Sequence, residues 1–140
     1  EENHPFEVEF SFTQTLHYHD LTRPETALAP PELPEDAQRW LGEEPPILFT
    51  PYLRELARVL TQGADSNLEK ARRIYDFITK NASYNFMPAF QLENIAENCA
   101  RSRTGDCGVF ALLFITLCRC AGVPARWQSG WKVEPASAVP

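Results

Sequence analysis

Residues 104–126 read TGDCGVFALLFITLCRCAGVPAR, and this stretch decides the fold. Between Val109 and Cys118 every residue except one threonine is apolar, so no polar stripe is left to face water. A helix that is apolar all round is a central, buried helix. Gly122 and Pro124 predict its end, because neither residue continues a helix well. The stretch therefore predicts a core helix against which the rest of the domain packs.

Cys107 lies at the entrance of this apolar run rather than inside it. Asp106 is a good N-cap, which places Cys107 in the first helical turn, where unpaired N–H groups and the helix dipole favour an anion. Such a position lowers the pKa of a thiol, and the Cys107 N–H could hold the oxyanion of a tetrahedral intermediate. Gly105 and Gly108 would keep the approach clear of side chains. The alternative is a small structural cysteine that begins a core helix, which periodicity does not exclude.

The sequence predicts no metal and no cofactor. The other cysteines, Cys99, Cys118 and Cys120, complete a C-x7-C-x10-C-x-C spacing without the paired C-x2-C knuckles of a zinc site. His17 and His19 share the polar face of a predicted strand, but no third ligand accompanies them. We expect these two histidines to be exposed polar residues.

The N-terminal third of the chain is organised differently from the rest. Alternating polar and apolar residues predict a half-buried strand over 6–18, and seven prolines between residues 23 and 51 predict a linker with a short helix at Glu35–Leu41. We therefore expect an N-terminal strand and proline-rich linker at 1–33, followed by a domain at 34–140.

Two amphipathic helices are predicted before the core helix. The first follows Thr50 as N-cap and Pro51 at the first helical position, and it ends before Gly63. The second, over 66–81, begins with a capping box. Its expected buried stripe comprises Ala71, Ile74, Tyr75 and Ile78. Residues 82–106 are expected to be irregular, with one helical turn near 94–98, and alternation predicts a strand over 126–133.

Charge excludes some partners. The net charge is −6, with −9 in residues 1–66 and +3 in residues 67–140, and no basic stripe is interleaved with aromatic residues. This argues against nucleic acid as the main partner. No apolar run approaches the roughly 20 residues that span a bilayer. Arg101 and Arg103, in the basic half, would add to the attraction for a thiolate at Cys107. The compartment stays open.

The segment RTGDCGVFALLFITLCRCAGVPARWQSGW resembles the nucleophile segment of the transglutaminase-like superfamily. In that family a glycine precedes the catalytic cysteine, a buried helix follows, and an R-x-x-G-[IV]-P-A-R turn leads into a strand. Arg119, Gly122 and residues 123–126 supply that turn, and the resemblance covers about 47–133. It implies an α+β, papain-like fold whose helical lobe surrounds the buried helix. It also implies acyl transfer through a thioester on Cys107, to water or to an amine, with a protein or peptide substrate.

The resemblance also implies a histidine and an aspartate downstream of the cysteine, and this chain has no histidine after His19. Using His17 or His19 instead would require a topology that the family does not use. We therefore expect a fragment in which the β-half is largely missing and which is inactive alone. Trp127 and Trp131, on the predicted strand, would then form an exposed apolar patch suited to self-association.

Three functional hypotheses follow. The favoured one is a thiol peptidase, amide hydrolase or transferase whose longer protein supplies the histidine and aspartate. The second is a family member without catalysis that serves as a binding or scaffold domain. The third is a redox or metal protein that uses all four cysteines, and their spacing argues against it.

Overall fold

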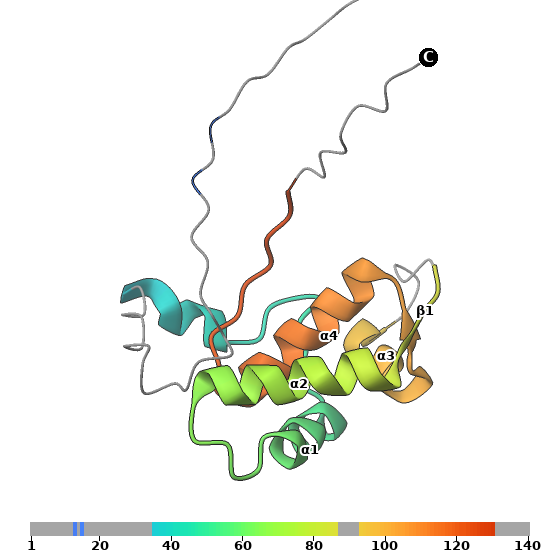
Figure 1. Ribbon diagram of the computed structural model, residues 1–140, viewed down its shortest axis with the longest axis horizontal. Coiled ribbons are helices and arrows are strands. Elements are labelled where there is room, and N and C mark those ends of the chain that lie inside the picture. Colours follow the sequence, from blue (N-terminus) through green and yellow to red (C-terminus); the bar gives the residue numbers. More distant parts are fainter. Residues whose placement is uncertain (1–12, 14, 16–34, 87–92, 131–140) are drawn as a thin grey trace, which may run out of the picture. The chain divides into compact units, whose positions relative to one another are not determined.

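The computed structural model describes residues 13, 15, 35–86 and 93–130, and this part of the chain is mostly helical (Figure 1). The chain divides into the units Glu1–Glu32 and Leu33–Pro140, and the named elements all lie in the second. The predicted strand over 6–18 lies outside the described residues apart from 13 and 15. The expected domain boundary after residue 33 stays a prediction. The elements, in chain order, are η2 (Glu35–Leu41), α1 (Pro51–Leu60), α2 (Asn67–Asn81), β1 (Ser83–Tyr84), α3 (Ile95–Ser102), β2 (Thr104–Gly105) and α4 (Cys107–Cys120).

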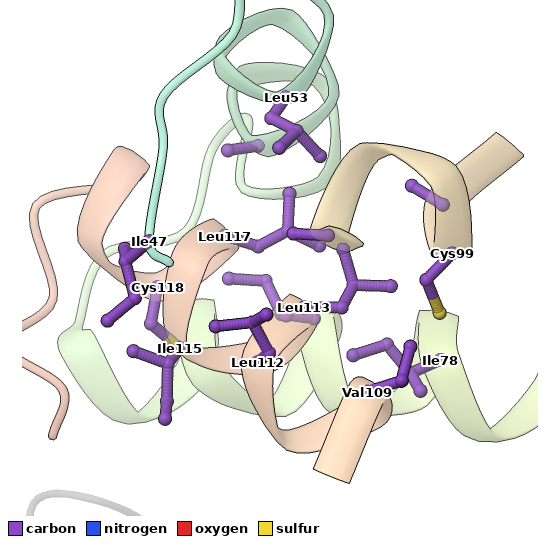
Figure 2. Close-up of a cluster of buried hydrophobic side chains, with 14 of the residues drawn as sticks. Ile47, Leu53, Ile78, Cys99, Val109, Leu112, Leu113, Ile115, Leu117 and Cys118 are labelled. Atoms are coloured by element: carbon purple, nitrogen blue, oxygen red, sulfur yellow. The ribbon is translucent and has the colours of Figure 1, made fainter. Parts of the chain in front are cut away.

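Helix α4 is the centre of the second unit, as the apolar run predicts. It packs against α1, α2 and α3 (Figure 1). Its buried side chains meet residues from each of these helices in one cluster, and the labelled members in Figure 2 include Leu53 from α1, Ile78 from α2 and Cys99 from α3. The fold is consistent with the expected α+β class, with a helical core and a small parallel sheet.

Helices α1 and α2 begin at the predicted caps. Thr50 accepts a hydrogen bond from the Leu53 amide at 3.2 Å, and Ser66 accepts one from the Glu69 amide at 3.0 Å. Each bond satisfies a first-turn N–H that has no acceptor within its helix. Gly63 follows α1 with a φ of +71°, a left-handed conformation that suits glycine.

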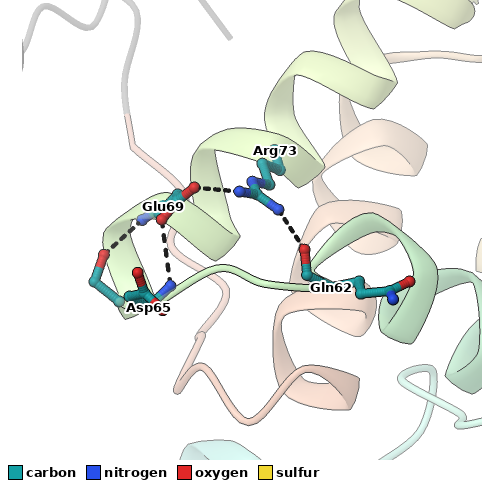
Figure 3. Close-up of polar contacts among 5 residues, drawn as sticks. Gln62, Asp65, Glu69 and Arg73 are labelled. Carbon is teal, nitrogen blue, oxygen red and sulfur yellow. Dashed lines mark hydrogen bonds and ion pairs between the residues drawn. The ribbon is translucent and has the colours of Figure 1, made fainter.

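The connection from α1 to α2 is held by polar contacts (Figure 3). Arg73 donates to the Gln62 carbonyl at 2.7 Å and forms an ion pair with Glu69. The Glu69 carboxylate also accepts from the Asp65 amide at 3.3 Å. One acidic side chain in the first turn of α2 therefore binds both the preceding loop and the arginine that ties this loop to the end of α1.

The expected burial of α2 is wrong at one position. Ile74 and Ile78 are buried as predicted, but Tyr75 is 59% exposed. Phe77, rather than Tyr75, is the aromatic residue of α2 that packs against the core. The buried face of α2 is therefore rotated toward Phe77. The spacing of the apolar residues in the sequence does not distinguish Phe77 from Tyr75.

Residues 82–106, expected to be irregular apart from one helical turn near 94–98, contain a longer helix at that place and two short strands. Helix α3 has eight residues, and its buried residues Ala96, Cys99 and Ala100 are small, which lets it pack closely on α4. Strands β1 and β2 pair in parallel, with Ser83 opposite Thr104 and Tyr84 opposite Gly105. Two strands of two residues each, about twenty residues apart, leave no periodic signal in the sequence. The irregular structure expected at residues 83–84 and 104–105 is therefore wrong.

The strand predicted over 126–133 does not appear in its described part. Residues 123–130 have no regular secondary structure, and residues 131–133 lie outside the described residues. A strand requires a neighbour to accept and donate its ladder hydrogen bonds. Within the described ranges no segment pairs with residues 126–130.

Candidate active site

Cys107 is the first residue of α4 and is exposed. Asp106 precedes it in extended conformation and accepts the Val109 amide on its carboxylate at 3.0 Å, while its carbonyl accepts the Phe110 amide at 2.9 Å. The amides of Cys107 and Gly108 precede these two and have no acceptor within the helix. An exposed thiol and the open amide end of a buried helix therefore occupy the same place, as the sequence predicts.

The two glycines beside Cys107 have different surroundings. Gly105 is buried, and a Cβ there would lie 2.7 Å from Cγ1 of Val109, closer than real Cβ contacts allow. A Cβ on Gly108 would lie 3.4 Å from Oδ1 of Asp106 and 3.9 Å from Cη2 of Trp127. The absence of a side chain at Gly105 thus serves the packing of β2 on α4. At Gly108, by contrast, a Cβ would make ordinary contacts with Asp106 and Trp127.

The other three cysteines differ from Cys107 in burial, and all four thiols are free. Burial raises the pKa of Cys118 to about 12, and burial together with the Asp106 charge raises that of Cys99 to about 11. Burial raises the pKa of Cys120 to about 11, although the charge of Arg54 acts in the opposite direction. Each of these three thiols is therefore held in its protonated, unreactive form at neutral pH.

Each of the two upstream arginines lies over an aromatic ring of another helix. Arg101 forms an ion pair with Glu97 at 2.7 Å and lies over the Tyr52 ring at 3.8 Å. Arg103 lies over the Phe77 ring, with 5.0 Å between the guanidinium carbon and the ring centroid. The two ring contacts bind α3 and the residue that follows it to α1 and α2. They give both guanidinium groups a structural role, and the added charge at Cys107 that the sequence suggested stays a prediction.

Two aromatic residues lie near Cys107 that the sequence did not identify as part of the site. Tyr84 pairs with Gly105 across the small sheet and meets the Phe110 ring edge to face, with centroids 6.4 Å apart. Trp127 lies beside Gly108. Tyr84 is 67% exposed and Trp127 is 49% exposed. No local signal could have placed them here, because both come from segments about twenty residues from Cys107 in the chain.

Arg119 holds the segment that leads to Trp127. This arginine is buried within α4, and its guanidinium donates to the carbonyls of Ala125 at 2.7 Å and Gly42 at 2.8 Å. Its third contact is an ion pair with Glu44 at 2.9 Å. The sequence identified Arg119 only as part of a motif. A charged residue inside an otherwise apolar helix is the signal that could have predicted a buried polar network.

The three histidines of the chain, His4, His17 and His19, lie outside the described residues. Among the described residues, no three His, Cys, Asp or Glu side chains are grouped as a metal site would require. A search of the same residues finds no helix long and apolar enough to cross a membrane.

The described part of the chain thus holds an exposed cysteine at the start of a buried helix, on which three other helices pack. The sequence model of the transglutaminase-like superfamily matches residues 54–139, and the chain belongs to this superfamily. An uncharacterized protein of Bacillus subtilis strain 168, YebA, is 30% identical over 84 residues. This match covers 56% of the present chain and 11% of YebA, so the chain spans a small part of that relative. No solved structure matches the chain significantly.

Proposed function

We propose that Cys107 is the nucleophile of a thiol acyl-transfer enzyme that acts on amide bonds of proteins or peptides. The observation that carries this proposal is the contrast among the four thiols. Cys107 is exposed at an open helix N-terminus, whereas burial raises the pKa values of the other three. The thiolate is the reactive form of cysteine, and a helix N-terminus favours an anion.

The reaction has two steps. The Cys107 sulfur attacks the amide carbonyl carbon, the C–N bond breaks, and the amine leaves with a proton, so that the acyl group stays on sulfur as a thioester. Water or a second amine then attacks the thioester carbon, and the thiol is regenerated. In each step the negative oxygen of the tetrahedral intermediate would lie near the amides of Cys107 and Gly108, which have no acceptor within α4.

The proton transfers require a base, and no histidine is among the described residues. We assign this role to a histidine oriented by an acidic residue, both contributed from beyond the printed sequence, in a papain-like arrangement. The chain covers only 11% of YebA, which is compatible with a longer protein that supplies further catalytic groups. His17 and His19 are the alternative within the chain, and the first experiment below distinguishes the two.

The proposal is tested by comparing the 140-residue chain with a longer protein that includes the downstream residues. Release of ammonia or incorporation of a labelled amine into a glutamine-containing peptide is measured for both. We expect turnover only in the longer protein, and we expect Cys107→Ala to abolish it. Activity of the short chain that depends on Cys107 would overturn the assignment of the base. If the longer protein keeps its activity after Cys107→Ala, the assignment of Cys107 as the nucleophile is wrong.

A family member without catalysis is the second candidate. In that case Cys107 would be a structural residue, and a longer protein would bind peptides without turnover.

Self-association through residues 126–133 also remains a prediction, because Trp131 lies outside the described residues. Sedimentation at several protein concentrations measures it directly.

A further inference from the structure

Trp127 lies beside Gly108, the residue that follows Cys107. It is twenty residues from Cys107 along the chain, yet Cη2 of its indole would lie 3.9 Å from a Cβ on Gly108, the residue next to the thiol. The residue remains 49% exposed. An indole that is half open to solvent beside a reactive group offers a large apolar face to whatever that group binds.

Hydrogen bonds hold the start of the segment that carries Trp127. Ala125, two residues earlier, donates its amide to the Trp40 carbonyl at 3.2 Å and accepts at its own carbonyl from Arg119. The Arg119 side chain is 1% exposed, so its bond to Ala125 is held by a donor that is itself buried. The indole therefore extends from an anchored backbone, which limits the positions it can take beside Gly108.

Helix geometry places different neighbours on the two flanks of Cys107. With 3.6 residues per turn, Gly108 lies about 100° from Cys107 in one direction around α4, and Phe110 lies about 60° from it in the other. The Phe110 flank is filled, because the Tyr84 ring packs against Phe110. The Gly108 flank has no side chain of its own, and Trp127 borders it. A group that extends from the Cys107 sulfur on this side would pass Gly108 and meet the indole.

We propose that Trp127 is a specificity-determining residue that contacts the acyl donor, binding an apolar or aromatic group next to the carbonyl that Cys107 attacks. This inference rests on the proposed function and adds the class of substrate: amide donors with an apolar side chain or stem beside the reacting carbon. The group that binds Trp127 is part of the acyl donor itself, because it is bonded to the carbonyl carbon that the Cys107 sulfur attacks. Trp127 would bind it by apolar contact and ring packing.

Alkylation tests this inference in the 140-residue chain, without the missing base. The probes are iodoacetamide and N-benzyl iodoacetamide, which deliver the same reactive carbon with and without an aromatic group. The second-order rate at Cys107 is measured by mass spectrometry of its peptide, and each rate is divided by that of free N-acetylcysteine with the same probe. We expect a preference of about three- to tenfold for the benzyl probe, the range that one aromatic pair contributes.

Trp127→Ala should remove this preference, which is read as the ratio of the two normalised rates and so does not depend on either rate alone. Trp127→Phe should retain part of it. Tyr75→Ala is the matched control, because Tyr75 is a similarly exposed aromatic residue on α2. Circular dichroism confirms that each variant is folded. If Trp127→Ala unfolds the chain, the ratio for Trp127→Phe against wild type decides the outcome.

The outcomes separate this inference from the proposed function. If iodoacetamide modifies Cys107 no faster than the other thiols, the proposed nucleophile is wrong. If Cys107 is selectively modified but shows no benzyl preference, the acyl-donor role of Trp127 alone is overturned. An equal loss of preference in Tyr75→Ala would overturn it as well, because the effect would then not depend on the neighbour of Gly108.

Discussion

The guanidinium of Arg119 and the carboxylate of Glu44 are 2.9 Å apart, although 75 residues separate them in the sequence. The arginine side chain is 1% exposed and the glutamate side chain 54% exposed, so the pair joins a buried cation to a solvated anion. The same guanidinium binds the carbonyls of Gly42 and Ala125. One side chain thus connects the core helix to the segment before α1 and to the segment that carries Trp127.

Arg119→Met should destabilise the domain more than Glu44→Gln does. Removing the arginine leaves the carbonyls of Gly42 and Ala125 without this donor, and we expect a loss of about 2–4 kcal/mol in the free energy of unfolding. Glu44 can be hydrated and its replacement leaves the two carbonyl bonds intact, so we expect about 1 kcal/mol or less. Urea denaturation measures both. Equal losses would show that the ion pair, rather than the carbonyl contacts, dominates.

Gly105→Ala and Gly108→Ala should differ in sign or size, although the two positions are three residues apart. A Cβ at Gly105 would lie 2.7 Å from Val109, and relieving that contact should cost about 1–3 kcal/mol. At Gly108 the nearest atom would lie at 3.4 Å, and alanine favours a helix over glycine, so we expect no loss and a gain of up to about 1 kcal/mol. Melting temperatures of the two variants check this. Adding Val109→Ala to Gly105→Ala should recover part of the loss that steric contact causes.

Iodoacetamide near pH 8 should modify Cys107 before the other three cysteines. With pKa values of about 11, only about one in a thousand molecules carries a thiolate at Cys99 or Cys120 at that pH, and both sites are also shielded by burial. Peptide mass spectrometry after limiting reagent gives the order of modification. Cys107→Ser should remove the fast phase. Fast modification of Cys120, the least buried of the three, would contradict the ranking.

The stability of the folded chain should fall above pH 9. The folded pKa values of Cys99, Cys118 and Cys120 are raised from 9.0 to between about 11 and about 12, so the unfolded chain releases protons that the folded chain keeps. Their contribution is complete below pH 9 and is lost as the pH rises through these values. Each thiol contributes a slope of up to about 1.4 kcal/mol per pH unit. Urea midpoints between pH 8 and pH 11 measure it, and Cys118→Ala should reduce the slope. If Cys118→Ala leaves the slope of stability against pH unchanged, that slope arises from other groups.

The sequence by itself determined the elements that depend on neighbouring residues. Thr50, Ser66 and Asp106 were predictable as caps because the cap and the amide that it accepts are three residues apart. The buried core helix was predictable because an apolar stretch of this length has no face to present to water. The same local rules placed Cys107 at an open helix end, and the matched family agrees with the resemblance carried by the surrounding motif.

Only the tertiary structure decided which distant segments meet that helix. The pairing of Tyr84 with Gly105, the position of Trp127 beside Gly108, and the contacts of Arg119 with Gly42 and Glu44 each join residues about twenty or more positions apart. Such contacts depend on how whole helices pack and leave no periodic pattern in either segment. Packing also turned Tyr75 outward and Phe77 inward, because the core accepts one narrow face of α2. The sequence therefore identifies the thiol, while its aromatic surroundings follow from packing between segments that are remote in the chain.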